Sequence, residues 1–227
     1  MRKIALTAAL ATAAALTTPA QAASADGKWE IKVLATGVLP DGKIDKVNSV
    51  IPAVATALGA SPETKANDNV VPTVAIEYYA TPNVSIETIC CLTTHKVTGL
   101  GSIAGADIAQ HVMILPATIT LKYHFDLGAV KPYIGAGPSL FFFIDERPGA
   151  TPTALGATSL KMDNEFAVAL QAGVDIPLGE SGLGISLDAK KYFVKPTTHF
   201  YAGTTEVLST THKLDPWVVS GGVFARF

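Results

Sequence analysis

Charge is scarce in this sequence. Only 16% of its 227 residues are Asp, Glu, Lys or Arg, whereas charged residues make up about 25% of a typical soluble domain. This deficit indicates that much of the protein surface does not face water. The net charge of -2 also lacks the clustered basic excess that phosphate binding requires, which argues against a nucleic-acid partner.

Cysteine is scarce as well. The two cysteines, Cys90 and Cys91, are neighbours in the sequence, and neighbouring side chains in a strand point to opposite faces. We therefore expect small apolar fillers rather than a disulfide framework. Long apolar runs are missing after residue 22, so nothing there looks like a membrane-spanning helix, which needs about 20 apolar residues.

The first 22 residues have the features of a secretion signal. Arg2 and Lys3 precede a short apolar stretch over residues 4–16, and residues 20–22 (AQA) form an A-x-A cleavage site. We predict that residues 1–22 are a cleaved signal peptide and that residues 23–227 form one domain.

Eight segments alternate apolar and polar residues with a period of two, which is the period of a β-strand. The fourth segment is the clearest, because Ile119 and Leu121 alternate with Thr120 and Lys122. The pattern predicts an all-β fold with strands near residues 28–38, 72–80, 84–93, 115–125, 130–143, 166–176, 183–189 and 214–227.

The connections between these segments alternate in length. Three are tight turns (81–83, 126–129 and 178–182) and four are long (39–71, 94–111, 144–162 and 195–213). Outer-membrane barrels have short periplasmic turns and long outer loops. We therefore predict an eight-stranded antiparallel transmembrane β-barrel with both termini in the periplasm and four long extracellular loops. A soluble lipocalin-like barrel is the alternative, and the signal, the loop asymmetry and the C-terminal Phe227 favour the membrane.

An outer-membrane location indicates which partners to expect. The barrel wall would contact outer-membrane lipid and lipopolysaccharide, and the outer-membrane assembly machinery would recognise the C-terminal strand that ends in Phe227. Small hydrophobic molecules are the expected ligands.

The inward-facing residues fall into two sets along the barrel. The upper apolar set, near the outer mouth, predicts a hydrophobic ligand channel and comprises Leu34, Ile89, Cys91, Ile114, Phe141, Phe143 and Val218. The lower charged set predicts a polar plug, because eight strands leave room only for side chains and buried charges must be paired. It comprises Glu30, Lys32, Glu77, Glu87, Lys122, His124, Lys131, Asp175 and Arg226.

A plug below a channel raises the question of where a ligand leaves. We hypothesise that it exits sideways through the wall into the membrane. Four glycines, Gly135, Gly137, Gly221 and Gly222, are candidate weak points, because glycine leaves gaps in a strand. The alternative is that each small residue accommodates barrel curvature or a bulky neighbour.

The first long connection carries apolar residues at helical spacing, which are Ile44, Val47, Ile51, Val54 and Leu58. They predict a short helix, limited by Pro52, that either forms a lid over the mouth or packs on the barrel rim.

No pattern indicates a metal, a cofactor or a catalytic site. The five histidines lack the close spacing of metal ligands, and no Walker loop, Rossmann fingerprint or nucleophile elbow is present. We predict that the protein is not an enzyme. Two other classes stay open: a structural or receptor barrel whose surface loops carry its role, and a lipid A-modifying barrel enzyme, which would need a nucleophile beside a base.

Several motifs add a family resemblance. The most specific are residues 122–125 (KYHF) and 131–138 (KPYIGAGP) across a short turn; others are residues 67–79 (NDNVVPTVAIEYY), Glu87, His95, 115–118 (LPAT), 171–175 (QAGVD), Asp188 and Lys190. In these motifs the chain resembles the OmpW family of outer-membrane proteins over nearly all its length after residue 22. Ala117 stands where the family pattern usually has a second proline. The resemblance implies an eight-stranded barrel with a narrow apolar channel that passes small hydrophobic molecules, and no enzyme.

Overall fold

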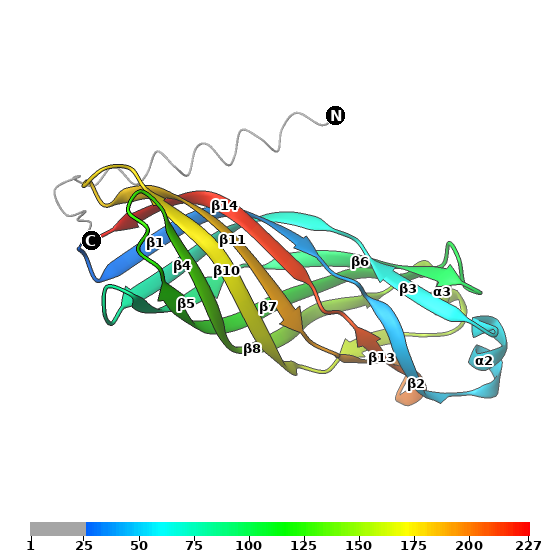
Figure 1. Cartoon of the computed structure of the whole chain (residues 1–227). Coiled ribbons are helices and arrows are strands. Elements are labelled where there is room, and N and C mark those ends of the chain that lie inside the picture. Colours follow the sequence, from blue (N-terminus) through cyan, green and yellow to red (C-terminus); the bar gives the residue numbers. More distant parts are fainter. Residues whose placement is uncertain (1–25) are drawn as a thin grey trace, which may run out of the picture.

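Eight antiparallel strands close into a barrel in the computed structural model, which describes residues 26–227. The predicted signal peptide lies outside the described residues. Around the barrel, each strand pairs with the next, and β14 closes onto β1 (Figure 1). In chain order the barrel strands are β1 (Trp29–Leu39), β4 (Asn69–Tyr79), β5 (Val84–Cys90), β7 (Asp107–His124), β8 (Lys131–Pro148), β10 (Glu165–Pro177), β11 (Leu183–Phe193) and β14 (Trp217–Arg226).

The alternation of side chains confirms the predicted parity. In the lower half of β7, Thr120 and Lys122 are buried inside the barrel, whereas Ile119 and Leu121 are 54% and 58% exposed on its outer wall. The outward side chains of the other barrel strands are likewise mostly apolar. The barrel therefore turns an apolar wall to the lipid, as a membrane-spanning barrel requires, and in its lower half the inward side chains are mostly polar.

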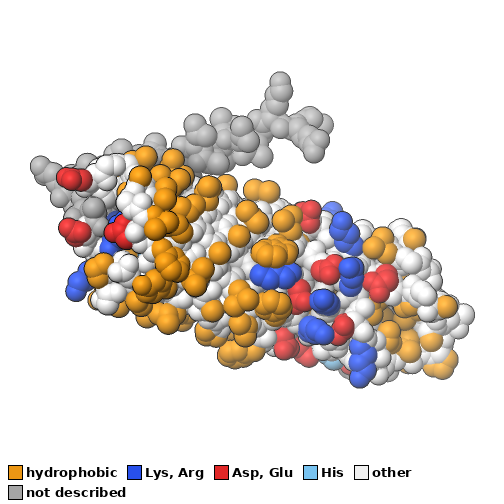
Figure 2. All heavy atoms as spheres, viewed as in Figure 1, with side chains coloured by type: hydrophobic (Ala, Val, Ile, Leu, Met, Phe, Trp, Pro, Cys, Tyr) orange, Lys and Arg blue, Asp and Glu red, His pale blue; other side chains and the backbone are white. Residues whose placement is uncertain are grey.

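The lipid-facing band has aromatic side chains at both edges. Trp29 packs against Tyr78 near the periplasmic turns, with ring centroids 4.9 Å apart, and Trp217 lies at the opposite end beside Lys191. Between them β1 has 11 residues, which at the usual rise and tilt span about 25 Å, the height of an outer-membrane barrel's apolar band. Figure 2 shows hydrophobic side chains gathered over the barrel, and charged side chains over the outer extension beyond it.

The long connections are not plain loops, which differs from the sequence-based expectation. They form an outer extension in which the upper part of β7 pairs with an added strand on one side and with the upper part of β8 on the other (Figure 1). The sequences of these strands, such as TTHFYA over residues 197–202, do not alternate apolar and polar residue types, so a period of two did not mark them. The added strands are β3 (Pro62–Ala66) and β6 (Thr93–Gly101) on the barrel sheet, and a separate sheet in the order β2 (Lys43–Val50), β13 (Thr205–Lys213), β12 (Thr197–Ala202) and β9 (Ser159–Met162).

The predicted helix in the first connection is shorter than its apolar pattern. Helix α2 (Pro52–Leu58) begins at Pro52, whose missing N–H is tolerated in the first helical turn. Ile44 and Val47 belong to β2 instead, so the prediction was wrong for the first half of the segment. A second helix, α3 (Ala150–Ala154), was not predicted. Within residues 26–227, no helix is long and apolar enough to cross a membrane.

Three of the four glycines singled out in the wall allow a close approach between strands. A Cβ on Gly137 would overlap the backbone of Ile119 in β7, and one on Gly222 would overlap Val33 in β1. A Cβ on Gly135 would come within 3.0 Å of a β7 carbonyl. Gly221 differs, because a Cβ there would meet only the side chain of Leu187, at 3.2 Å. The close approaches favour the curvature role over the weak-point role at three positions.

We predict that Gly137→Ala destabilises the barrel by roughly 1–3 kcal/mol, because the new methyl group must push β8 away from the β7 backbone. Gly221→Ala is the matched control and should fold like the wild type, because the Leu187 side chain can move aside. Refolding yield, read from heat-modifiable migration on a gel, tests both variants. Equal yields from the two would contradict the close-approach explanation.

Candidate functional site

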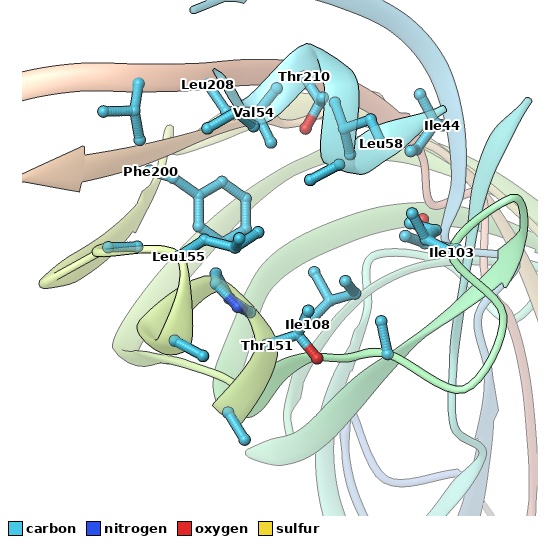
Figure 3. A pocket seen from close by; sticks show the side chains of 18 of the residues that line it. Ile44, Val54, Leu58, Ile103, Ile108, Thr151, Leu155, Phe200, Leu208 and Thr210 are labelled. Carbon is cyan, nitrogen blue, oxygen red and sulfur yellow. The ribbon is translucent and has the colours of Figure 1, made fainter. Parts of the chain in front are cut away.

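An apolar cavity lies in the outer extension, between the two sheets and the two helices. It has a volume of about 480 Å³. The labelled side chains in Figure 3 converge on it from α2, the α3 segment, β7, β12 and β13. Its lining includes Ile44, Val54, Leu58, Ile103, Ile108, Leu155, Phe200, Val207 and Leu208. We call this space the outer cavity.

One corner of the outer cavity is polar. The Nε2 atom of His212 lies 2.8 Å from the Thr210 hydroxyl, and its Nδ1 atom lies 3.3 Å from the Thr64 hydroxyl. The Thr64 hydroxyl donates a hydrogen bond to the Gly42 carbonyl at 2.6 Å. Burial lowers the pKa of His212 to about 4, so this side chain is neutral at pH 7. The corner offers hydrogen bonds without a charge.

Two smaller cavities continue from the outer cavity toward the barrel. The first, of about 40 Å³, shares Ile108, Phe200 and His212 with the outer cavity. The second, of about 20 Å³, shares Leu214 with the first and lies in the upper barrel. Apolar side chains therefore separate three cavities of decreasing size.

The upper apolar set is buried as a whole, in agreement with its predicted inward direction. Cys91, Ile114, Phe141 and Val218 line the 20 Å³ cavity. The remaining members, which do not line it, are Leu34, Ile89 and Phe143. The set therefore surrounds a closely packed space rather than a wide pocket, and its role as a channel stays a prediction.

Most residues that line the outer cavity were not predicted from the sequence as site residues. They lie in segments that were treated as loops, where no lipid-facing period marks them. The apolar pattern that includes Ile44, Val54 and Leu58 was a usable signal, because all three face the cavity. Phe200 and Leu208 had no such signal, since their strands pair in a sheet of their own.

The lower charged set forms a connected network inside the barrel. Lys32 Nζ lies 3.2 Å from Glu30, 3.1 Å from Glu77 and 3.1 Å from Asp175. Lys122 Nζ lies 2.7 Å from Glu77 and 2.9 Å from Glu87. These side chains are fully buried, so each ammonium group supplies the charge that its carboxylates need.

Other members complete this network at its edges. His124 Nε2 lies 2.9 Å from Glu77, and the Arg226 guanidinium lies 3.6 Å from the centre of the Tyr79 ring. Lys131 differs from the predicted sealed position, because it is only half-buried and lines a cavity of about 200 Å³ at the periplasmic mouth. We had predicted a more deeply buried position for Lys131. Lys131 is the first residue of β8 and therefore lies near the barrel end.

The network also includes a group of side chains around Lys190 that was not part of the predicted plug. Lys190 Nζ lies 2.7 Å from Asp188 and 3.0 Å from Glu87. The Gln171 amide donates to Asp188 at 2.6 Å and to Glu87 at 3.0 Å. The alternation placed Asp188 and Lys190 on the inward face, so their sequence signal was available.

Three carboxylates, Glu30, Glu77 and Asp175, lie close enough together to suggest a cation site. The Lys32 ammonium already lies within 3.2 Å of all three. The cluster is therefore explained by an internal cation, and the arrangement needs no metal ion.

Comparison with known proteins now adds to this geometry. The OmpW family model matches residues 25–227. The chain belongs to the OmpW family. A relative in Sinorhizobium fredii, described as the uncharacterized outer-membrane protein y4mB, is 32% identical over 96% of this chain and 90% of its own length. The dibenzothiophene metabolism operon protein PahQ of Pseudomonas aeruginosa is 30% identical over 59% of this chain and 60% of its own.

A solved structure has the same fold. The outer membrane protein OprG from Pseudomonas aeruginosa superimposes with a TM-score of 0.75 at 20% sequence identity, covering 88% of this chain and 96% of that chain. This OmpW-family chain is therefore an outer-membrane β-barrel, with its extension on the outer side and its tight turns in the periplasm.

We predict that Lys122→Met destabilises the barrel by about 3–5 kcal/mol, because it leaves Glu77 and Glu87 buried without their nearest cation. Lys195→Met is the matched control, since Lys195 is exposed and its ion pair with Asp45 lies at the surface. Urea unfolding in lipid vesicles measures the difference. If the charged network did not stabilise the barrel, both variants would have the same urea midpoint of unfolding.

A second prediction concerns pH. Because the pKa of His212 is lowered to about 4, against about 6.5 in an unfolded chain, the unfolded state binds a proton between these values and the folded state does not. The stability of the extension should therefore fall as the pH drops from 6.5 toward 4. Protection of the β13 amides against hydrogen exchange, corrected for intrinsic rates, should fall over this window. His212→Gln should flatten the fall, and an unchanged slope would contradict this role.

Proposed function

We propose that this OmpW-family barrel admits small, uncharged hydrophobic molecules across the outer membrane and that the outer cavity captures them. The observation that carries the proposal is the cavity itself. Its 480 Å³ falls within the usual range of ligand pockets, about 300–1,000 Å³. An apolar ligand there would gain about 25 cal/mol per Å² removed from water.

The polar corner narrows the class of ligand. His212 is neutral at pH 7, and the hydroxyls of Thr64 and Thr210 carry no charge. A charged ligand would therefore lose its hydration without gaining a partner. The name of the relative PahQ, which refers to dibenzothiophene metabolism, supports an uncharged aromatic compound.

The smaller cavities suggest how a ligand could move from the outer cavity into the barrel, and the charged network suggests where this path stops. A ligand that moved down past Phe200 and Leu214 would reach the upper apolar set. Below it the network of Lys32, Lys122 and Lys190 would have to open, at the cost of unpaired buried charges. We therefore propose a sideways exit above the network.

Breaks between the barrel and the extension are the best candidates for this exit. Pro40 separates β1 from β2, Pro196 separates β11 from β12, and Pro216 separates β13 from β14. Proline lacks the N–H that a continuous ladder needs. Pro40 and Pro216 also line the 20 Å³ cavity, so these strand breaks lie at the level where the apolar path ends. Backbone hydrogen bonds such as the one from Asp41 N–H to the Leu214 carbonyl still cross the breaks, and an exit there would have to open them. This location replaces the close-packed glycines as the proposed exit.

The proposal includes two further roles. The protein acts without catalysis, since capture and release need only differences in solvation. Its last strand presents Phe227, whose backbone pairs with Trp29 at 2.7 and 2.9 Å across the closure, and we propose that the assembly machinery engages this strand before closure.

A structural or receptor barrel is the second candidate. The narrowness of the upper barrel favours it, because a cavity of about 20 Å³ holds no ligand without movement. The ordered extension would then be the working surface. Transport measurements separate the two candidates, since a purely structural barrel would not speed the entry of any probe.

We predict that Leu208→Lys lowers the uptake of an uncharged polycyclic fluorescent probe into proteoliposomes at least tenfold. The lysine places a charge inside the outer cavity, where an apolar probe cannot solvate it. Leu100→Lys is the matched control, because Leu100 is exposed on β6 and lies outside the cavity lining. Equal uptake by both variants would remove the outer cavity from the route, and uptake no faster than in protein-free vesicles would favour the structural candidate.

A further inference from the structure

Five lysines gather on one side of the extension, directly beyond the lipid-facing band. They lie on or beside the continuations of β1, β11 and β14, and Figure 2 shows basic side chains just past the hydrophobic band on the visible face. We call this surface the lysine patch. Its members are Lys43, Lys46, Lys191, Lys195 and Lys213.

Strand register fixes the height of the patch. Trp217 is paired with Leu39 of β1 and with Lys191 of β11, so the three are direct neighbours at the outer ends of their barrel strands. The Lys191 ammonium lies 5.2 Å from the Trp217 ring centre. Aromatic and basic side chains at one level mark the membrane interface. The next paired lysines outward, Lys43 and Lys213, therefore stand at the level of the lipid headgroups.

The acidic partners of the patch compensate its charge only in part, and the Lys191 ammonium donates to the Asp215 backbone carbonyl. Lys43 lies 3.3 Å from Asp41, and Lys195 lies 2.9 Å from Asp45, both in exposed pairs. Such pairs contribute little and exchange readily with other ions. The Asp215 carboxylate is taken up by the Val194 N–H at 2.8 Å and lies a loose 3.8 Å from Lys213.

The patch also contains an arrangement that costs stability on its own. Lys43 and Lys213 are direct cross-strand partners, and like charges in such pairs are destabilising. Lys46 follows on the same edge strand and is exposed. Five lysines thus face three aspartates, and two of the lysines repel each other. An anion bound between the two ammonium groups would offset this repulsion.

A neighbouring part of the extension has the reverse balance, and its strand β9 belongs to the same four-stranded sheet as β2 and β13. There the outer ends of β8 and β10 and the neighbouring β9 carry four carboxylates against two cations, which are Asp145, Glu146, Asp163 and Glu165 against Arg147 and Lys161. The lysine excess is therefore local, since the other exposed lysines of the extension lie on other strands, as Lys65 on β3 and Lys96 on β6 do. A site for one bound anionic molecule needs such a local excess.

We propose that the lysine patch binds the phosphate groups of a phosphorylated glycolipid of the outer leaflet. Its acyl chains would lie on the exposed apolar side chains directly below, among them Leu187, Trp217 and Val219. The surface is thus apolar where acyl chains run and basic where headgroup phosphates sit. This proposal does not rest on transport, because the patch lies outside the outer cavity.

The test compares two triple variants of the purified barrel in non-ionic detergent. Lys43→Gln, Lys46→Gln and Lys213→Gln together remove the centre of the patch. Lys65→Gln, Lys96→Gln and Lys161→Gln remove the same charge from exposed positions elsewhere on the extension. Binding of fluorescent lipopolysaccharide is measured for each, and heat-modifiable migration confirms that both variants fold.

The patch variant should bind about 100-fold more weakly than the wild type, since each lysine near an anionic headgroup contributes roughly a factor of five. The control variant should stay within a factor of three. Dephosphorylated lipid A should bind the wild type as weakly as intact lipopolysaccharide binds the patch variant. Equal weakening in both variants, unchanged affinity of the patch variant, or undiminished binding of dephosphorylated lipid A would each overturn the proposal.

Discussion

Closure of the β1–β14 ladder is the constraint on which the rest of the structure depends. Hydrocarbon offers no partner to a backbone N–H or C=O, so a strand wall within it must pair every such group internally. The final pairs between Trp29 and Phe227, at 2.7 and 2.9 Å, complete that ring. Tight closure explains why glycines at positions 137 and 222 face neighbouring backbone, since a side chain would hold the strands apart.

Closure with eight strands also sets what the interior can contain. Alternation sends half of the side chains inward, and the enclosed space is about as wide as those side chains fill. The polar residues that alternate with lipid-facing ones therefore meet inside, where each charge needs an opposite charge. Lys32, Lys122 and Lys190 each touch at least two carboxylates. The network is thus a consequence of the lipid-facing pattern and not a separate addition to the fold.

The sequence pattern predicted the strands whose register the lipid constrains, and it missed the strands of the extension, which the lipid does not constrain. Period two identified all eight barrel strands and the inward direction of residues such as Glu77 and Phe141, because one wrong register would expose charges to hydrocarbon. The extension has no such penalty: its strands β12 and β13 were read as loops, and Ile44 and Val47 were read as helix. The outer cavity is built from these segments, so its lining could not be predicted from the barrel pattern.

The same constraint explains why room for a ligand appears where it does. Inside the barrel, the ladder holds opposite walls at a fixed distance, and the upper cavity measures only about 20 Å³. In the extension, β2 and β9 are edges of a separate sheet, so the two sheets are free to stand apart and enclose 480 Å³. Water surrounds this region, so its edge strands can leave backbone groups unpaired at little cost. A capture site outside the membrane is therefore what a narrow, closed and charge-filled barrel permits.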